Sequence, residues 1–334
     1  MNDKGIRTTD NVDSLLGNPE KALWRMSIPL IISLFITSLY NLIDAIWVAG
    51  LGADALAGVG FFTPIFMILV GFGNGLGSGA AFAISKYIGE ENKIKADNAS
   101  IHSILIDIII SIIITILLLI FLNPILNVMG AGQTIGYATD YGVIILLGSI
   151  FIILSNALYG IFRGEGDTTR PMYAMIASAV LNIVLDPIFI YTLNLGVRGA
   201  AIATLISAVF VIIILIYWFY IKKDTYLHPV LANFNFEREI STDIVKVGIP
   251  ASVQLLNNAF FAAVFSALLT YVGSTDSVAV YSTGWRIVTI GTTPLLAIGT
   301  ALISVIAANY GAKNYKNIQI AHRYAMKVSI VIAV

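Results

Sequence analysis

The chain contains no cysteine, and only 11% of its 334 residues are charged. The absence of cysteine excludes disulfide bonds, zinc thiolate sites and cysteine nucleophiles. Soluble domains carry about 25% charged residues, so a soluble protein of this composition could not cover its own surface. The net charge is zero and no basic block is present, so we expect no nucleic-acid partner. The composition indicates a protein whose surface is covered in part by membrane lipid.

Long hydrophobic runs take the place of charge: 58% of the residues are hydrophobic, and the mean hydropathy is +0.88. Since a membrane-spanning helix needs about 20 mostly apolar residues, the sequence predicts an all-α, polytopic membrane protein. The first 26 residues are polar and of mixed charge, unlike a cleavable signal peptide. The predicted spans are 27–49, 58–84, 100–122, 138–162, 170–192, 197–221, 247–271 and 281–308. A ninth span begins near residue 320, and we expect the chain to be a C-terminally shortened protein that stops inside it.

Basic residues are distributed unevenly between the two sides that these spans define. Sixteen of the nineteen lysine and arginine residues fall in the N-terminal segment and the even-numbered loops. The remaining three are Arg198, Arg286 and Lys327. Because cytoplasmic loops carry an excess of lysine and arginine, we expect a multi-pass protein of the cell membrane with a cytoplasmic N-terminus.

The chain also repeats itself in parallel, with an offset of 221 to 222 residues. Six predicted spans separate the copies, and an even number preserves their direction, so the halves are related by an axis along the membrane normal. Such repeats are typical of transporters. The matching segments are Ile28-Pro29 with Ile249-Pro250, Asp54-Ala55-Leu56-Ala57 with Asp276-Ser277-Val278-Ala279, Gly77 with Gly299, and Gly89 with Gly311.

This repeat predicts the domain organisation. We expect a cytoplasmic N-terminal segment with an amphipathic lead, a complete six-helix bundle, a cytoplasmic linker and the start of a second bundle. About eight or nine of twelve helices are then present. The expected boundaries are 1–26, 27–221, 222–246 and 247–334.

Two carboxylates deep in the predicted first bundle are the main functional candidates, because ionisable groups inside a bilayer are costly. Asp44 and Asp186 lie roughly 25 and 22 Å from the cytoplasmic edge at 1.5 Å per residue. Tyr40 and Asn182 precede them by one turn and share their helix faces, and Thr204 enters the sixth span. Such a group can bind Na⁺ or hold a proton, so we expect a cation site here. No other cofactor or metal is expected.

A third carboxylate, Asp107, lies about two turns into the third span. We expect its side chain to snorkel to the surface or to make a local hydrogen bond, and its replacement by asparagine to do little. Pro187, directly after Asp186, predicts a kink in the fifth span. The carbonyl that this kink frees is a further candidate ligand for the cation.

Other polar residues lie in the fourth and seventh spans. Tyr141 and Asn156 belong to the fourth span, and Gln254 and Asn257 to the seventh. The seventh span has no carboxylate, since the repeat places Phe265 opposite Asp44. We therefore expect cation coupling in the first bundle.

A likeness to a known family runs from about Pro19 to the end of the chain, and it rests on several motifs in a specific order. They are Asn18-Pro19-Glu20-Lys21-Ala22-Leu23-Trp24, Ile28-Pro29, Leu42-Ile43-Asp44, Gly52-Ala53-Asp54-Ala55-Leu56-Ala57-Gly58, Arg163-Gly164-Glu165-Gly166-Asp167-Thr168-Thr169-Arg170-Pro171 and Leu181-Asn182-Ile183-Val184-Leu185-Asp186-Pro187. This series resembles the multidrug and toxic compound extrusion (MATE) family, in its DinF-like prokaryotic branch.

The resemblance implies two six-helix bundles in a V shape that alternate between outward-open and inward-open states. It implies export of small cationic or amphipathic organic compounds in exchange for H⁺ or Na⁺, by a monomer surrounded by lipid. It places the cation site at Asp44 and Asp186, with Tyr40, Asn182 and Thr204 around them. Tyr141 and Asn156 line the same cavity by the same likeness, and we expect the substrate cavity of such a transporter to include Tyr141, Asn156, Gln254 and Asn257.

Three other functions compete with this interpretation. A flippase for lipid-linked precursors, from the same superfamily, would need several cationic residues in its cavity, and only Arg286 lies within a complete span. A membrane scaffold that moves nothing would not need two carboxylates at matched depth. The GxGD pattern of intramembrane proteases occurs at Gly164-Glu165-Gly166-Asp167, but in a short loop, where we expect Asp167 to cap the next helix. We therefore expect no enzyme activity.

Overall fold

The computed structural model describes residues 9–272 and 275–333, and the described part is helical with no strand. Some side chains between residues 258 and 289, among them that of Arg286, lie outside the described residues. The α-helices are α1 (Asp10–Leu16), α2 (Pro19–Ala49), α3 (Ala53–Gly89), α4 (Lys93–Val128), α5 (Ile135–Leu147), α6 (Ser149–Gly164), α7 (Thr169–Pro187), α8 (Val197–Tyr217), α9 (Arg238–Val272), α10 (Thr275–Gly311) and α11 (Tyr315–Ala333). Short 3₁₀ segments η1 (Gly132–Thr134) and η4 (Leu231–Asn233), and π segments η2 (Ile188–Thr192) and η3 (Trp218–Lys222), complete the order.

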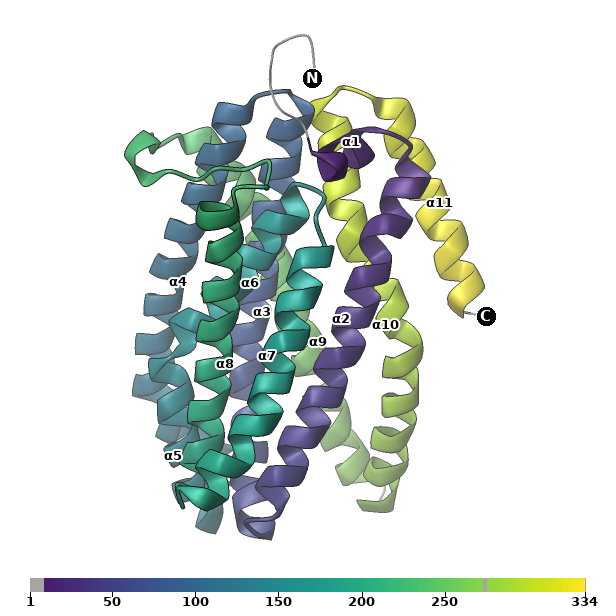
Figure 1. Ribbon diagram of the computed structural model, residues 1–334. Helices are drawn as coiled ribbons and strands as arrows, with labels where there is room; N and C mark the ends of the chain where they lie inside the picture. The colour runs from purple at the N-terminus through teal and green to yellow at the C-terminus, as the bar shows by residue number, and fades with distance from the viewer. Residues whose placement is uncertain (1–8, 273–274, 334) are drawn as a thin grey trace.

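The long helices lie side by side along one axis (Figure 1). Six helices in the described part are long and apolar enough to cross a membrane. The prediction of an all-α polytopic membrane protein is therefore confirmed. The predicted single span 138–162 is wrong in one respect, because α5 and α6 form a broken pair bent by 53°. The break falls at Gly148, where a Cβ would run into the side chain of Leu205.

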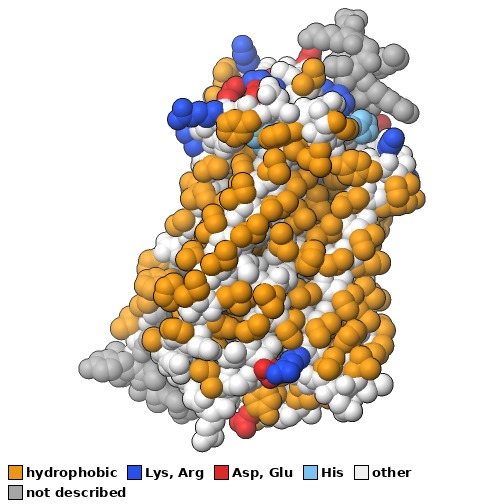
Figure 2. All heavy atoms as spheres, turned by 90° about the vertical axis from the view of Figure 1, so that its left-hand side faces the viewer, with side chains coloured by type: hydrophobic (Ala, Val, Ile, Leu, Met, Phe, Trp, Pro, Cys, Tyr) orange, Lys and Arg blue, Asp and Glu red, His pale blue; other side chains and the backbone are white. Residues whose placement is uncertain are grey.

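Charged residues gather at one end of the bundle. The described start of the chain, the α3–α4 and α6–α7 turns, the 223–237 linker and the α10–α11 turn all lie at the same end (Figure 1). Figure 2 shows most of the visible lysine and arginine side chains at this end, above a wide apolar belt. On the opposite end Arg198 pairs with Asp140, with 2.8 Å between Nη2 and Oδ1. The arrangement fits a protein that crosses the membrane repeatedly.

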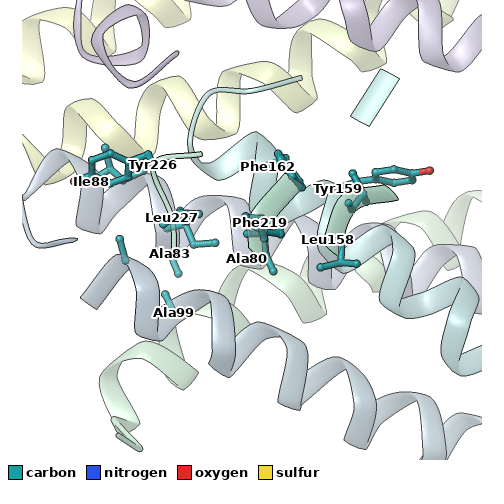
Figure 3. Close-up of a cluster of buried hydrophobic side chains, with 14 of the residues drawn as sticks. Ala80, Ala83, Ile88, Ala99, Leu158, Tyr159, Phe162, Phe219, Tyr226 and Leu227 are labelled. Carbon is teal, nitrogen blue, oxygen red and sulfur yellow. The ribbon is translucent and has the colours of Figure 1, made fainter. Parts of the chain in front are cut away.

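The linker is tied to the charged end of the first six spans. Glu165, in the α6–α7 loop, accepts hydrogen bonds from the backbone N–H groups of Tyr226 and Leu227, at 3.0 and 3.1 Å from Oε2. The side chains of Tyr226 and Leu227 enter a buried cluster with residues of α3, α4 and α6; Figure 3 shows them beside Ile88 and Ala83. Helix α9 then begins at Arg238, inside the predicted linker.

The internal repeat of the sequence is also seen in the structure, where α3 and α10 and the turns after them match. Helices α3 and α10 both have 37 residues and begin 222 residues apart, at Ala53 and Thr275. Each is followed by a turn with one residue at positive φ, Glu91 and Lys313, both at 55°. In each turn an asparagine three residues after the helix end caps the next helix: Asn92 Oδ1 accepts from Lys95 N (3.0 Å), and Asn314 Oδ1 accepts from Asn317 N (3.2 Å).

The two copies meet through their glycines. A Cβ on Gly89 would strike the carbonyl oxygen of Ala308, and a Cβ on Gly311 would strike the carbonyl oxygen of Lys86. Residues 86 and 308, like residues 89 and 311, are 222 positions apart. The contact is therefore self-complementary, as expected of two copies related by a local twofold axis. This supports the predicted parallel repeat.

Small residues also let α3 pack closely on both sides. Gly75 and Gly79 face α9, where a Cβ would strike Ser252 and the carbonyl oxygen of Ile244. Gly73 and Gly77 face α6 instead. Glycine at membrane-helix interfaces permits this close backbone approach. Helix α3 consequently lies between α6 and α9.

The short helix α1 joins the two halves at the charged end. Val12 packs into the cluster formed by α3, α4 and α6, whereas Leu15 packs into a second cluster with α2, α10 and α11. Arg25 of α2 fixes α1 by donating to the carbonyl of Asp10 at 3.0 Å and to Asn11 Oδ1 at 3.0 Å. The amphipathic lead beginning at Pro19 is continuous with α2 rather than a separate segment.

Candidate functional site

A pair of carboxyl groups lies at the centre of the first six spans. Asp44 comes from α2 and Asp186 from α7, and the two carboxyl groups lie within hydrogen-bonding reach of each other. Asp186 is fully buried. One oxygen of each group, Oδ1 in both, has no hydrogen-bond partner among the described residues. Two carboxylates this close repel each other unless a cation or a shared proton lies between them.

An amide on the same helix holds Asp186 in place. Asn182 precedes Asp186 by one turn and is 1% exposed. With its amide oriented to satisfy both neighbours, the Asn182 nitrogen donates to Asp186 Oδ2 at 2.9 Å. Its oxygen then accepts from the backbone N–H of Thr204 at 3.2 Å. Asn182 thereby fixes α7 against α8 at the depth of the carboxyl pair.

Two phenols complete the group. The Thr204 hydroxyl donates to the carbonyl of Ala200 at 3.1 Å, and it lies close to the phenols of Tyr40 and Tyr141. Tyr40 belongs to α2 and Tyr141 to α5. Residues from four helices therefore surround the two carboxyl groups, and this cluster of six residues is here named the carboxyl cluster: Tyr40, Asp44, Tyr141, Asn182, Asp186 and Thr204.

Local sequence explains how α7 presents Asp186. Helix α7 ends at Pro187 and continues as the π-helical segment η2, where Leu193 N donates to the Ile188 carbonyl at 2.9 Å. Proline removes a backbone donor and disturbs the regular α-helical pattern, and π-helical turns occur often at functional sites. The Tyr191 hydroxyl of η2 donates to the carbonyl of Trp47. This hydrogen bond fastens α7 to α2 about one turn beyond the carboxyl pair.

Three predicted cavity residues lie apart from the carboxyl cluster. Asn156 packs against Gly73 of α3, and its amide donates to the carbonyl of Ile152 at 2.9 Å. Gln254 and Asn257 are exposed on α9, on the other side of α3. The structure thus brings together six of the nine predicted site residues, and the substrate cavity that includes the other three stays a prediction.

The expected surroundings of Asp107 are wrong, whereas the expected small effect of its replacement by asparagine stays a prediction. Its side chain is 1% exposed, so it does not snorkel, and neither carboxyl oxygen has a hydrogen-bond partner among the described residues. The spacing of Ser103 and Ser111, one turn on either side of Asp107, could have indicated a polar strip on one face of α4. In the structure both serines are buried, as Asp107 is. In contrast, Asp167 behaves as expected: its Oδ1 accepts from the backbone N–H groups of Thr169 and Arg170 at the start of α7.

Comparisons with known proteins agree with this architecture. The MatE family model matches residues 29–188 and 250–334. The multidrug export protein MepA of Staphylococcus aureus is 28% identical over 317 residues, which cover 94% of this chain and 70% of that protein.

Solved structures give the same result. A crystal structure of MATE in the straight conformation is 41% identical, with a TM-score of 0.92, and the match covers 98% of this chain and 73% of that one. The outward-facing conformation of a multidrug resistance MATE family transporter is 42% identical, with a TM-score of 0.93, over 98% of this chain and 72% of that one. The family model covers most of the chain, the folds agree, and the chain accordingly belongs to the MatE family of membrane transporters.

Proposed function

We propose that this chain exports small cationic or amphipathic organic compounds by antiport with H⁺ or Na⁺, and that the carboxyl cluster is its cation-coupling site. The observation that carries the proposal is the pair formed by half-buried Asp44 and fully buried Asp186, with residues from four helices around it. The relatives named above include a multidrug export protein and a multidrug resistance transporter. These relatives favour efflux over the alternative of a flippase for lipid-linked precursors.

The chemistry of the pair suggests how coupling works. Two neighbouring carboxylates inside the membrane are penalised by desolvation and by repulsion, and a cation removes both penalties. Cation binding therefore favours the conformation in which Asp44, Asp186, Asn182 and Thr204 close together. A ligand shifts a conformational equilibrium by its difference in affinity for the two states.

Alternating access supplies the second half of the cycle. Similar MATE structures have been solved in straight, bent and outward-facing conformations. A membrane potential provides about 2.3 kcal/mol per charge per 100 mV, so one or two cations per cycle suffice to concentrate a substrate. The N-terminus and the charged end of the bundle face the cytoplasm in this proposal, because the basic residues gather there.

Cation flux in liposomes tests the proposal. The protein is reconstituted, a pH or sodium gradient is imposed, and substrate-stimulated cation movement is measured together with efflux of a fluorescent organic cation. Asp44→Asn and Asp186→Asn should each abolish gradient-driven efflux, since an amide cannot exchange a cation. Asp140→Asn is the matched control, because Asp140 is a surface carboxylate paired with Arg198. Wild-type pumping with unchanged cation dependence in either cluster variant would show that the coupling site is assigned wrongly.

A further inference from the structure

A second buried carboxyl lies in the first six spans, away from the carboxyl cluster. Asp107 is in α4, roughly 21 Å along the helix from its start at Lys93. Asp186 is about 26 Å along α7 from Thr169, and Asp44 about 38 Å along α2 from Pro19. Because all three helices start at the charged end, Asp107 lies nearest to that end.

The surroundings of Asp107 on α4 offer oxygen lone pairs and no donor. Ser103 donates its hydroxyl proton to the carbonyl of Ala99 at 2.8 Å, and Ser111 donates to the carbonyl of Ile108 at 2.8 Å. Both hydroxyl oxygens therefore keep their lone pairs free. Both Asp107 oxygens are buried without a hydrogen-bond partner among the described residues, and no ion pair to Asp107 occurs in that part of the chain.

A buried carboxylate without a partner is strongly unfavourable, because it loses its hydration and gains nothing in exchange. Removing the charge or adding an opposite one relieves this penalty, and a cation does either. Hard cations prefer oxygen ligands such as carboxylate and hydroxyl groups. We propose that Asp107, with Ser103 and Ser111, forms a second binding site for a monovalent cation, either a proton or Na⁺.

The same side of α4 continues toward the carboxyl cluster. One turn beyond Ser111, the Thr115 hydroxyl forms a hydrogen bond with the hydroxyl of Ser149. Ser149 opens α6 directly after the helix break at Gly148, and α5 on the other side of that break carries Tyr141. Along the helix axes the proposed site therefore lies nearer to the charged end than the coupling site does, with the Thr115–Ser149 hydroxyl pair two turns beyond Asp107 on α4.

Binding to the purified chain in detergent tests this site independently of transport. Equilibrium binding of radioactive Na⁺ counts the sodium ions per chain, and infrared spectroscopy detects the carbonyl band of a protonated carboxyl. If the site binds Na⁺, Asp107→Asn lowers the stoichiometry by one ion. If it binds a proton, the variant loses one protonated-carboxyl band and keeps its sodium stoichiometry.

Two controls separate this proposal from the proposed function. Asp140→Asn should change neither readout, and Asp44→Asn should leave the Asp107 signal in place even if the coupling site is assigned wrongly. If Asp107→Asn does not fold, Ser103→Ala and Ser111→Ala serve instead. Each should weaken Na⁺ binding about tenfold, or shift the carboxyl band, because each removes one ligand oxygen. A folded Asp107→Asn chain with both readouts unchanged, or serine variants with neither effect, would overturn the proposal.

Discussion

Two side chains, Glu165 and Arg170, connect segments at the charged end of the molecule. Glu165 is 1% exposed, in the loop between α6 and α7, and it receives two backbone hydrogen bonds from the linker. Arg170 lies 3.8 Å away from its Oε1 and also contacts Asp224 at 3.0 Å. One carboxyl and one arginine of the α6–α7 turn thus fasten this turn to the linker that follows the sixth span.

The protonation of Glu165 should make stability depend on pH. Burial is the main cause that raises the pKa of Glu165 from its ordinary value of 4.5 to about 8. Between these two values the folded chain binds a proton that the unfolded chain has lost, so the free energy of unfolding falls as pH rises through this window. The unfolding temperature of the detergent-solubilised wild type should drop across the window, by on the order of 5 °C.

Glu165→Gln provides the comparison, because glutamine accepts the same two backbone hydrogen bonds and has no proton to lose. Its unfolding temperature should lack this part of the pH dependence. Parallel curves for the wild type and Glu165→Gln between pH 4.5 and 8 would contradict the prediction. Glu20→Gln, a change on the exposed surface near the start of α2, controls for a general effect of removing a carboxylate.

At the scale of whole helices, close packing of α3 on α10 should be sensitive to one methyl group. Gly89→Ala would place a Cβ against the backbone carbonyl of Ala308, which cannot rotate away as a side chain can. Overpacking of this kind costs about 1–3 kcal/mol. We expect a lower unfolding temperature for Gly89→Ala in detergent, and the same for Gly311→Ala, which meets Lys86 in the equivalent contact.

Gly299→Ala is the matched control in α10, since nothing lies within 4 Å of the position of its Cβ. Alanine forms helix better than glycine by about 1 kcal/mol, so this variant should be as stable as the wild type or more so. Equal losses in Gly89→Ala and Gly299→Ala would mean that the α3–α10 contact is not the cause.

The sequence predicted helices better than it predicted their breaks and their partners. Each span predicted from hydropathy falls within helical structure, because the lipid requirement for about 20 apolar residues is a property of composition. Hydropathy could not locate the break at Gly148, which depends on how closely Leu205 of α8 approaches. Spacing placed Asp44 and Asp186 at similar depth, but the same reasoning failed for Asp107. The sequence does not show which face of α4 is covered by neighbouring helices.

For the molecule as a whole, orientation in the membrane is a direct test of the fold. The chain has no cysteine, so single introduced cysteines can be labelled without background. Thr225 is buried and unsuitable, but Leu231 in the same linker is 71% exposed. Leu231→Cys should react with a membrane-impermeant maleimide only after permeabilisation, because the linker lies at the basic end.

Gln133→Cys, exposed in η1 of the α4–α5 connection, should react from outside in intact cells. Each variant controls for the other: in intact cells only Gln133→Cys should be labelled, and Leu231→Cys should become labelled after permeabilisation. Labelling of Leu231→Cys in intact cells would reverse the proposed orientation, and with it the direction of transport.

The paired glycine contact also bears on the origin of the chain. Gly89 reaches the α10 backbone and Gly311 reaches the α3 backbone in the same way, and the turns that follow share their positive φ and their asparagine caps. Two identical copies of a half-length ancestor could form this contact twice in a homodimer, since an isologous interface needs only one kind of surface. Gene duplication and fusion would then preserve the interface while freeing each copy to diverge. Phe265 stands at the position equivalent to Asp44, so one carboxyl of the pair differs between two halves that still share the glycine contact.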